Sequence, residues 1–93
     1  MTYHVKFTNA YKKDYKRAKK RGLNLQLLDD VVDELRQGHQ LDAKYRDHEL
    51  HGNWAGFREC HIQPDWILIY LIEEDVLILT CVDTGTHSDI FKK

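Results

Sequence analysis

Residues 66–82 read WILIYLIEEDVLILTCV, and this stretch decides the fold of the chain. Two apolar runs lie on either side of an acidic turn at 73–75, which predicts two buried strands. A third strand-like segment precedes them and is separated from them by the turn signal Pro64-Asp65. Because parallel neighbours require long crossovers, such short connections predict an antiparallel meander. Its expected strands are 54–62, 66–72 and 76–82.

The N-terminal part of the chain predicts a short strand followed by two amphipathic helices. Residues 3–7 alternate well enough for the strand. The first helix places Tyr11, Tyr15 and Ala18 on one face, with most lysines elsewhere. The second helix carries an apolar stripe made of Leu27, Leu28, Val31, Val32 and Leu35. Residues suited to begin or end the two helices are Thr8 or Asn9, Gly22, Asn24 and Gly38.

Together these elements predict an α+β fold in which a two-helix hairpin packs on the sheet. A chain of 93 residues buries one small core, so we expect a single domain over residues 1–93. The apolar runs have no polar face. One sheet face should therefore meet the helices, and the other needs cover from the C-terminal segment, from a partner or from a concave site. Residues 39–53 have no clear period and are expected to form a loop.

Cysteine usage and hydropathy indicate the compartment. Cys60 and Cys81 lie in strand-like, apolar surroundings, which favours buried reduced thiols over a disulfide. The N-terminus lacks the apolar segment of a signal peptide, and no apolar run approaches the ~18 residues of a membrane span. We therefore expect a cytoplasmic chain without membrane association.

The charges are strongly segregated along the chain, although the formal net charge is only -1. Residues 12–21, KKDYKRAKKR, hold seven basic residues against one acid. Such a patch indicates a polyanionic partner or an acidic protein that masks it, and a merely solvated helix face is the competing interpretation.

Histidines are the best candidates for chemistry, because imidazole exchanges protons near neutral pH. His4 and His39 have no chemical neighbour in sequence and are expected on the surface. The other four histidines fall in the loop, strands and turn around the meander. His61 and His87 should lie at the same edge of the sheet, with Asp65 beside them. Zinc binding is a competing interpretation of His48, His51, His61, Asp65 and His87, but the spacing lacks the close ligand pairs of structural sites, so no metal or other cofactor is expected.

Proton chemistry without a metal suits the attack of an RNA 2′-hydroxyl on its adjacent phosphate. A base takes the hydroxyl proton, an acid protonates the leaving oxygen, and cations stabilise the charged phosphorane. Phe91, Trp66 and Trp54 could stack on splayed bases, although both tryptophans are more often core residues.

The chain resembles the YafQ branch of the RelE/ParE toxin superfamily over nearly its whole length. The motifs that carry this resemblance are Tyr45-x-Asp47-His48-x-Leu50-x-Gly52, Phe57-Arg58-Glu59-Cys60-His61, Pro64-Asp65-Trp66 and Thr84-Gly85-Thr86-His87-Ser88-x-x-x-Phe91. The resemblance implies a RelE-like fold: two helices on a twisted antiparallel sheet, with a short N-terminal strand, the three-strand meander and a short C-terminal helical turn. It also implies the toxin of a type II toxin-antitoxin system, a ribosome-dependent mRNA interferase that is held by a DinJ-like antitoxin. The complex would bind operator DNA through that antitoxin.

The resemblance also implies roles for individual residues. The positions that match the family's catalytic set are His48, His61, Asp65 and His87, and Trp66 and Phe91 line this set. His87 is the expected general acid, and the base is one of His48, His61 and Asp65.

One position departs from the family pattern. Asp83 stands before the Thr-Gly motif, where the family usually has arginine. An acid beside the scissile phosphate would oppose the developing charge. Three explanations are open: Asp83 points away, the toxin is slow, or another cation serves, namely Arg58, Lys44 or Arg46.

The basic segment gains a candidate role from the resemblance, because a toxin that enters the ribosome meets rRNA phosphate. The expected ribosome contacts are Lys12, Lys13, Lys16 and Lys19. The antitoxin could cover this surface or the active cleft. The alternative function is a non-enzymatic toxin similar to ParE, which inhibits a cellular target such as gyrase.

Overall fold

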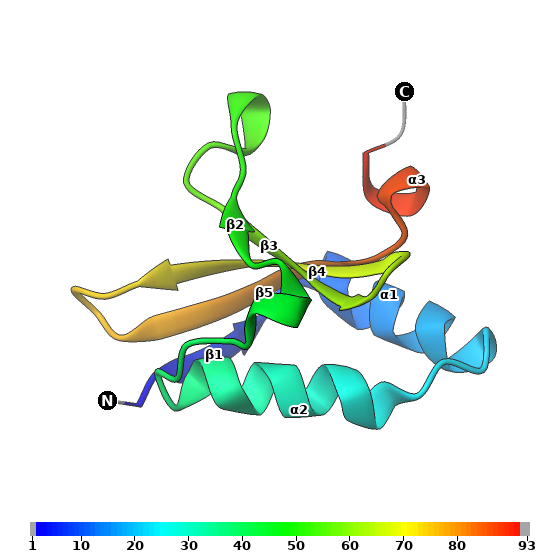
Figure 1. Cartoon of the computed structure of the whole chain (residues 1–93), viewed down its shortest axis with the longest axis horizontal. Coiled ribbons are helices and arrows are strands. Elements are labelled where there is room, and N and C mark those ends of the chain that lie inside the picture. The colour runs from blue at the N-terminus through cyan, green and yellow to red at the C-terminus, as the bar shows by residue number, and fades with distance from the viewer. Residues whose placement is uncertain (1, 92–93) are drawn as a thin grey trace.

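The structure, a computed structural model, describes residues 2–91, and its centre is a five-stranded sheet in the order β1-β5-β4-β3-β2 (Figure 1). The strands are β1 (His4–Phe7), β2 (His48–Glu49), β3 (Arg58–Gln63), β4 (Trp66–Glu73) and β5 (Ile78–Gly85). The expected meander is confirmed, because β3, β4 and β5 pair antiparallel in chain order. The sheet as a whole is mixed rather than antiparallel, since β1 runs parallel to β5. Almost the entire chain separates these two strands, so no tight turn forces them to run in opposite directions.

Two helices, α1 (Asn9–Lys20) and α2 (Leu25–Arg36), cover one face of the sheet and run in opposite directions (Figure 1). The expected caps are confirmed. The Thr8 hydroxyl accepts the backbone N–H of Tyr11 at 3.0 Å, and the Asn24 side chain accepts that of Gln26 at 3.1 Å. The residue after each helix cap is a glycine with a positive φ angle, 76° at Gly22 and 79° at Gly38.

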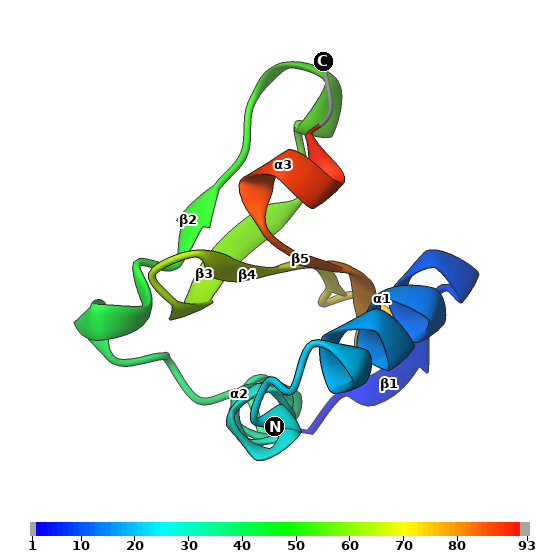
Figure 2. The same ribbon diagram turned by 90° about the vertical axis from the view of Figure 1, so that its right-hand side faces the viewer.

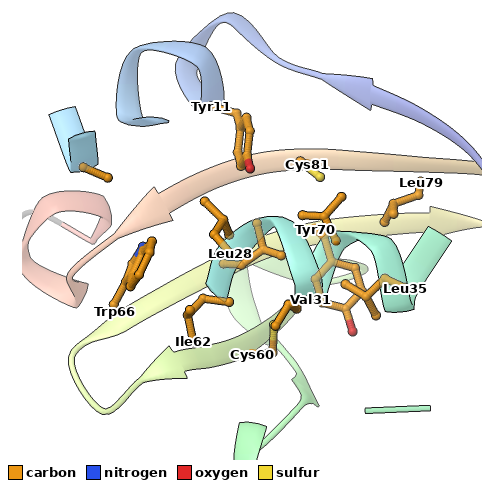
Figure 3. Packing of buried hydrophobic residues seen from close by; sticks show 13 residues of the cluster. Tyr11, Leu28, Val31, Leu35, Cys60, Ile62, Trp66, Tyr70, Leu79 and Cys81 are labelled. Atoms are coloured by element: carbon orange, nitrogen blue, oxygen red, sulfur yellow. The ribbon is translucent and has the colours of Figure 1, made fainter. Parts of the chain in front are cut away.

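The core lies between these helices and the sheet (Figure 3). Four of the five expected α2 stripe residues are buried, but Leu27 is 36% exposed and lies outside the core. Cys60 and Cys81 are free, fully buried thiols, as expected, and burial raises the pKa of Cys81 to about 12. A thiol with so high a pKa is a packing residue rather than a nucleophile.

Several element boundaries differ from those expected from the sequence. The loop over 39–53 holds β2 and two 3-10 turns, η1 (Ala43–Tyr45) and η2 (Gly52–Trp54), so β3 begins four residues later than expected. The last strand runs from Ile78 through Gly85, because β1 on one side and β4 on the other continue its backbone pairing. Local sequence does not contain this pairing, which depends on strands distant along the chain.

The second sheet face is covered by the C-terminal segment. Helix α3 (His87–Ile90) lies on the side of the sheet opposite α1 and α2 (Figure 2). Ile67 and Ile69 are fully buried although they alternate with the core-facing residues of β4. Among residues 2–91, no helix has the length and apolar character needed to cross a membrane.

Candidate active site

A buried glutamate on β3 organises the second sheet face. Side chains alternate along a strand, so Glu59 and His61 point away from the helices while Cys60 and Ile62 enter the core. The Glu59 side chain is only 5% exposed. Its Oε2 atom lies 3.1 Å from Nε2 of His87, 3.3 Å from Nε2 of His61 and 3.6 Å from Nε2 of His48. We call these four residues the histidine–glutamate cluster.

Three separate elements bring the histidines to this carboxylate. His48 is the β2 residue that pairs directly with Glu59, which explains why a two-residue strand matters to the site. His61 lies two residues further along β3. His87 is the first residue of α3, where the chain turns back over the sheet after β5. The ring centroids are 6.4 Å apart for His48 and His61 and 5.6 Å apart for His61 and His87.

Backbone carbonyls determine which ring nitrogen carries the proton in two of the histidines. Nδ1 of His48 lies 2.7 Å from the carbonyl oxygen of Arg46. A carbonyl only accepts, so this Nδ1 must donate, and the neutral ring keeps an unprotonated Nε2 facing the cluster. His61 is held in the same sense by the Pro64 carbonyl at a longer 3.3 Å. His87 differs, because its Nε2 faces the carboxylate at hydrogen-bond distance and donates to it.

Aromatic side chains border the cluster beside His87. Phe91 stacks on the His87 ring with centroids 5.8 Å apart, and Trp54 meets Phe91 edge to face at 5.5 Å. Phe91, which the resemblance placed beside the catalytic set, is thus in contact with His87. Trp66, expected to line the substrate site, is instead a core residue, 3% exposed (Figure 3). Its indole N–H donates to the Thr84 hydroxyl at 2.9 Å. The β4 alternation directs it toward the helices.

The three predicted cations divide into two groups. Lys44 and Arg46 line a hollow of about 490 Å³ together with His61. Arg58 does not belong to this hollow. Its guanidinium pairs with Asp47 at 3.3 Å, and the Tyr70 hydroxyl donates to the same carboxylate. Burial is the main reason why the pKa of Tyr70 is raised above its usual value, and the hydrogen bond to Asp47 adds to it.

Two acidic residues singled out in the sequence lie outside the cluster. Asp65 is exposed at the β3–β4 turn and lines a neighbouring hollow with Arg21 and Thr86. Within the described part of the chain it forms no hydrogen bond or ion pair with the clustered histidines. Burial and the neighbouring carboxyl group of Asp14 on α1, which accepts the backbone N–H of Thr84, raise the pKa of Asp83 to about 7. Among the residues that the structure describes, Asp83 forms no hydrogen bond or ion pair with the clustered histidines, which favours the explanation that it points away.

The carboxylate that does join the histidines is one that the sequence did not single out. Glu59 stands two residues before His61 in a predicted strand, and that spacing alone places both side chains on one face. What the pattern could not indicate is that this face is closed over the carboxylate by His87, which comes from the other end of the meander.

The donor set also fits a metal ion. One ligand atom each from Glu59, His61 and His87 lies within 4.8 Å of the others. Imidazole nitrogens with one carboxylate are ligands that zinc and copper accept. In the sequence, the spacing of the candidate ligands, which included His51, argued against a metal site. In the structure His51 lies outside this group, as the residue before η2.

The predicted ribosome contacts lie on the other side of the molecule. All four lysines, Lys12, Lys13, Lys16 and Lys19, are exposed on α1. Helix α1 packs on the sheet face opposite α3 (Figure 2). The basic surface and the histidine–glutamate cluster are therefore separated by the thickness of the sheet.

Two antiparallel helices on one face of a small mixed sheet, with a polar cluster on the other face, are the architecture of a RelE-like toxin. Residues 3–92 match the sequence model of a family described as "Bacterial toxin of type II toxin-antitoxin system, YafQ". The chain belongs to this YafQ family.

Known relatives extend this comparison. The chain is 38% identical over 88 residues to the mRNA interferase toxin YafQ of Escherichia coli K12, covering 94% of each chain. It matches YafQ in the crystal structure of the E. coli DinJ-YafQ toxin-antitoxin complex with a TM-score of 0.89 at 36% identity, covering 98% of this chain and 99% of that one. A metal-bound toxin from Helicobacter pylori matches with a TM-score of 0.89 at 38% identity, covering 98% of this chain and 100% of that one.

Proposed function

We propose that this chain is an mRNA interferase that cuts mRNA on the ribosome by attack of a ribose 2′-hydroxyl on the adjacent phosphate. The observation that carries the proposal is the histidine–glutamate cluster, in which three imidazoles from different elements face one buried carboxylate. This arrangement supplies proton donors and acceptors at one point, as the reaction requires. The E. coli relative, named an mRNA interferase, supports the same activity.

His48 is the best general base among the candidates. Its Nδ1 proton is held by the Arg46 carbonyl at 2.7 Å, so Nε2 is available to take the 2′-hydroxyl proton. His87 then serves as the acid: it delivers a proton to the 5′ oxygen while the bond from phosphorus to that oxygen breaks. The products are a 2′,3′-cyclic phosphate and a 5′-hydroxyl. Glu59 orients the rings and balances the charge of whichever imidazole is protonated.

Substrate binding follows from the groups around the cluster. Lys44 and Arg46, which border the hollow beside His61, would contact the mRNA phosphates and stabilise the charge that develops during cutting. Phe91, with Trp54 against it, offers a stacking surface for a splayed base next to His87.

The antitoxin partner has a candidate surface on the helical side. A hollow of about 460 Å³ lies between α1 and α2, floored by Tyr11 and Val32 and bordered by Lys12 and Lys16. Phe7, 46% exposed, adds an uncovered aromatic ring at this hollow. An amphipathic, acidic segment of a DinJ-like antitoxin would bury these rings and pair with the lysines. Such a complex would hold the toxin away from the ribosome and could bind operator DNA through the antitoxin.

A metal ion is a competing occupant of the same site. Glu59, His61 and His87 would hold Zn²⁺ or Cu²⁺, and coordination would occupy the nitrogen lone pairs on which acid–base catalysis depends. The metal-bound H. pylori relative is consistent with such binding. In our proposal the metal inhibits, and cutting itself proceeds without one.

The test is a cleavage assay with purified ribosomes programmed with mRNA, read by primer extension. His48→Gln and His87→Gln should each lower the single-turnover rate about a hundredfold or more, since general acids and bases contribute roughly 10²–10⁴. His39→Gln is the matched control, because His39 is exposed and, among residues 2–91, its side chain pairs with Glu34 on α2 alone. Wild-type cutting should persist in EDTA.

Two results would contradict the proposal. Full activity in both cluster variants would remove the acid–base assignment. Growth arrest with intact mRNA would instead support the alternative, a ParE-like inhibitor that cuts no nucleic acid.

A further inference from the structure

Helix α3 carries His87, and Phe91 directly follows it, yet the helix has only four residues, His87–Ile90. A single helical turn is unstable by itself, because nucleation fixes several residues for one hydrogen bond. Its own capping box helps: the Thr86 hydroxyl accepts the Asp89 backbone N–H at 3.0 Å, and the Asp89 carboxylate accepts the Thr86 N–H at 2.9 Å. This box shapes the turn but does not attach it to the rest of the molecule.

The attachment comes from the end of α1. Arg21, which follows the last residue of that helix, donates two hydrogen bonds to Asp89, from Nη1 at 2.7 Å and from Nη2 at 3.1 Å. This two-pronged geometry fixes direction as well as distance. The hydrogen bond from Arg21 is also the main reason why the pKa of Asp89 lies far below its usual value. Asp89 is well shielded, with its side chain 16% exposed.

The surroundings of Asp89 leave it little freedom. Nη2 of Arg17, one turn earlier on α1, lies 3.8 Å from the same carboxylate and also donates to Asp14 at 3.0 Å. Asp89 also rests against Gly85, where a Cβ atom would come within 2.9 Å of its Oδ2. Because Gly85 has no side chain, the Asp89 carboxylate fits against its backbone at the point where β5 leads into α3.

We propose that Arg21 and Asp89 are positioning residues that hold α3 so that His87 reaches Glu59. The inference rests on the proposed ribonuclease function. Asp89 lies two residues after His87 in the same turn, so rotation of α3 would swing the imidazole away from its 3.1 Å contact with Glu59. A displacement of about 1 Å at a reacting group can cost about a hundredfold in rate. The core between the sheet and the helices does not include α3, so the loss should affect chemistry more than folding.

Single-turnover kinetics on programmed ribosomes test this pairing. Arg21→Ala and Asp89→Asn should each lower the maximal cutting rate ten- to hundredfold with KM unchanged. The double variant should be no slower than the slower single variant, because both changes break the same contact. Asn at position 89 retains an oxygen for the Thr86 cap, so this change removes the ion pair selectively. The exchanged pair Arg21→Asp with Asp89→Arg should recover part of the rate.

A matched control and an independent measurement separate this proposal from others. Arg36→Ala breaks the Arg36–Asp33 pair on α2, which is as close, at 2.6 Å, and should leave cutting unchanged. NMR of ¹⁵N-labelled histidines reports the His87 hydrogen bond without any cutting. Its ring signals should shift in Arg21→Ala and Asp89→Asn, whereas those of His48 should stay.

Each outcome bears on the proposal. An increase in KM with an unchanged rate would make Arg21 a ribosome contact and overturn the positioning role. Unchanged His87 signals would overturn it as well. If the wild type cuts no mRNA but the His87 signals shift as expected, the ribonuclease function fails while the role of the pair in holding α3 stands.

Discussion

At the level of single residues, Glu59 and Asp83 are the acidic groups with the most unusual surroundings, and their roles differ. Glu59 is buried beneath three imidazoles, and Nε2 of His87 donates a hydrogen bond to it. Asp83 lies close to Asp14 on α1, whose carboxylate accepts the backbone N–H of the next residue, Thr84, so two carboxyl groups are neighbours. Like charges so placed favour the neutral form of one of them. The acid at this position therefore bears on the contact between α1 and β5, and within residues 2–91 it forms no hydrogen bond or ion pair with the clustered histidines.

Asp83 gives a prediction about stability and pH. Its pKa is about 7 in the folded chain and about 4 in an unfolded one, so the folded protein holds the extra proton between these values. Stability should therefore fall as pH rises from about 4 to about 7. Asp83→Asn replaces the titrating carboxyl group with an amide, so this loss of stability with rising pH should disappear. The thermal midpoint at pH 8 should rise by roughly 4–8 °C, about 1 kcal/mol after allowance for solvent screening, with little difference at pH 4.

Thermal unfolding followed by circular dichroism across this pH range measures the effect. Asp75→Asn, in the exposed β4–β5 turn, is the control and should leave the profile unchanged. If Asp83→Asn changed the thermal midpoint by the same amount at pH 4 and at pH 8, Asp83 would not be the group that takes up the proton.

At the level of elements, alternate residues of β4 point to opposite faces of the sheet, of which one packs in the core and the other carries the cluster. Trp66, Leu68 and Tyr70 enter the core, whereas Ile67 and Ile69 support the opposite face, on which the cluster lies. The resemblance to the YafQ branch assigned Trp66 to the substrate site. Strand alternation assigns it to the core, and Trp54 on η2 takes the place beside Phe91.

Trp66→Phe distinguishes these two roles. The change removes the indole N–H that donates to Thr84, and the protein should lose about 1–2 kcal/mol of stability. The rate of cutting below the unfolding temperature should stay within about twofold of wild type. Urea unfolding and the ribosome cleavage assay measure the two quantities on one preparation. A large drop in cutting with unchanged stability would return Trp66 to the substrate site.

At the level of the whole molecule, charge and chemistry lie on opposite faces. Helix α1 lies on one side of the sheet and α3 on the other (Figure 2). The hollow beside Phe7 is lined by α1, and the cluster includes His87 of α3. A partner can therefore bind α1 without touching the histidines. This separation is consistent with a toxin that is oriented by rRNA on one side while mRNA reaches the other.

Neutralising Lys12, Lys13, Lys16 and Lys19 to glutamine tests that orientation. Ribosome affinity should fall, and the dependence of log affinity on log salt should become shallower by nearly one for each rRNA phosphate that the toxin no longer neutralises. Filter binding at several salt concentrations measures both. Lys6→Gln on exposed β1 is the control for a general charge effect. If affinity and salt slope both stayed the same, α1 would be only a solvated face.

Much of the architecture was predictable because its causes are local. Helix caps at Thr8 and Asn24, the apolar run of β4 and the short turns of the meander depend on neighbours a few residues away. Those signals predicted the α+β fold and the order of the main elements. The direction of β1 was not predictable, since its partner β5 lies some seventy residues further on.

The sequence by itself determined the helices, the meander and the pool of histidines available for chemistry, because periodicity and turn residues act within a single element. Only the tertiary structure decided which of those groups meet. It placed Glu59 rather than Asp65 among the histidines, paired Arg58 with Asp47, brought Asp83 close to Asp14, and joined Arg21 to Asp89 in the turn that carries His87. The reason is physical: a side chain's partners are set by strand pairing and by the packing of α3 across the sheet, and these contacts join residues that are far apart in the chain.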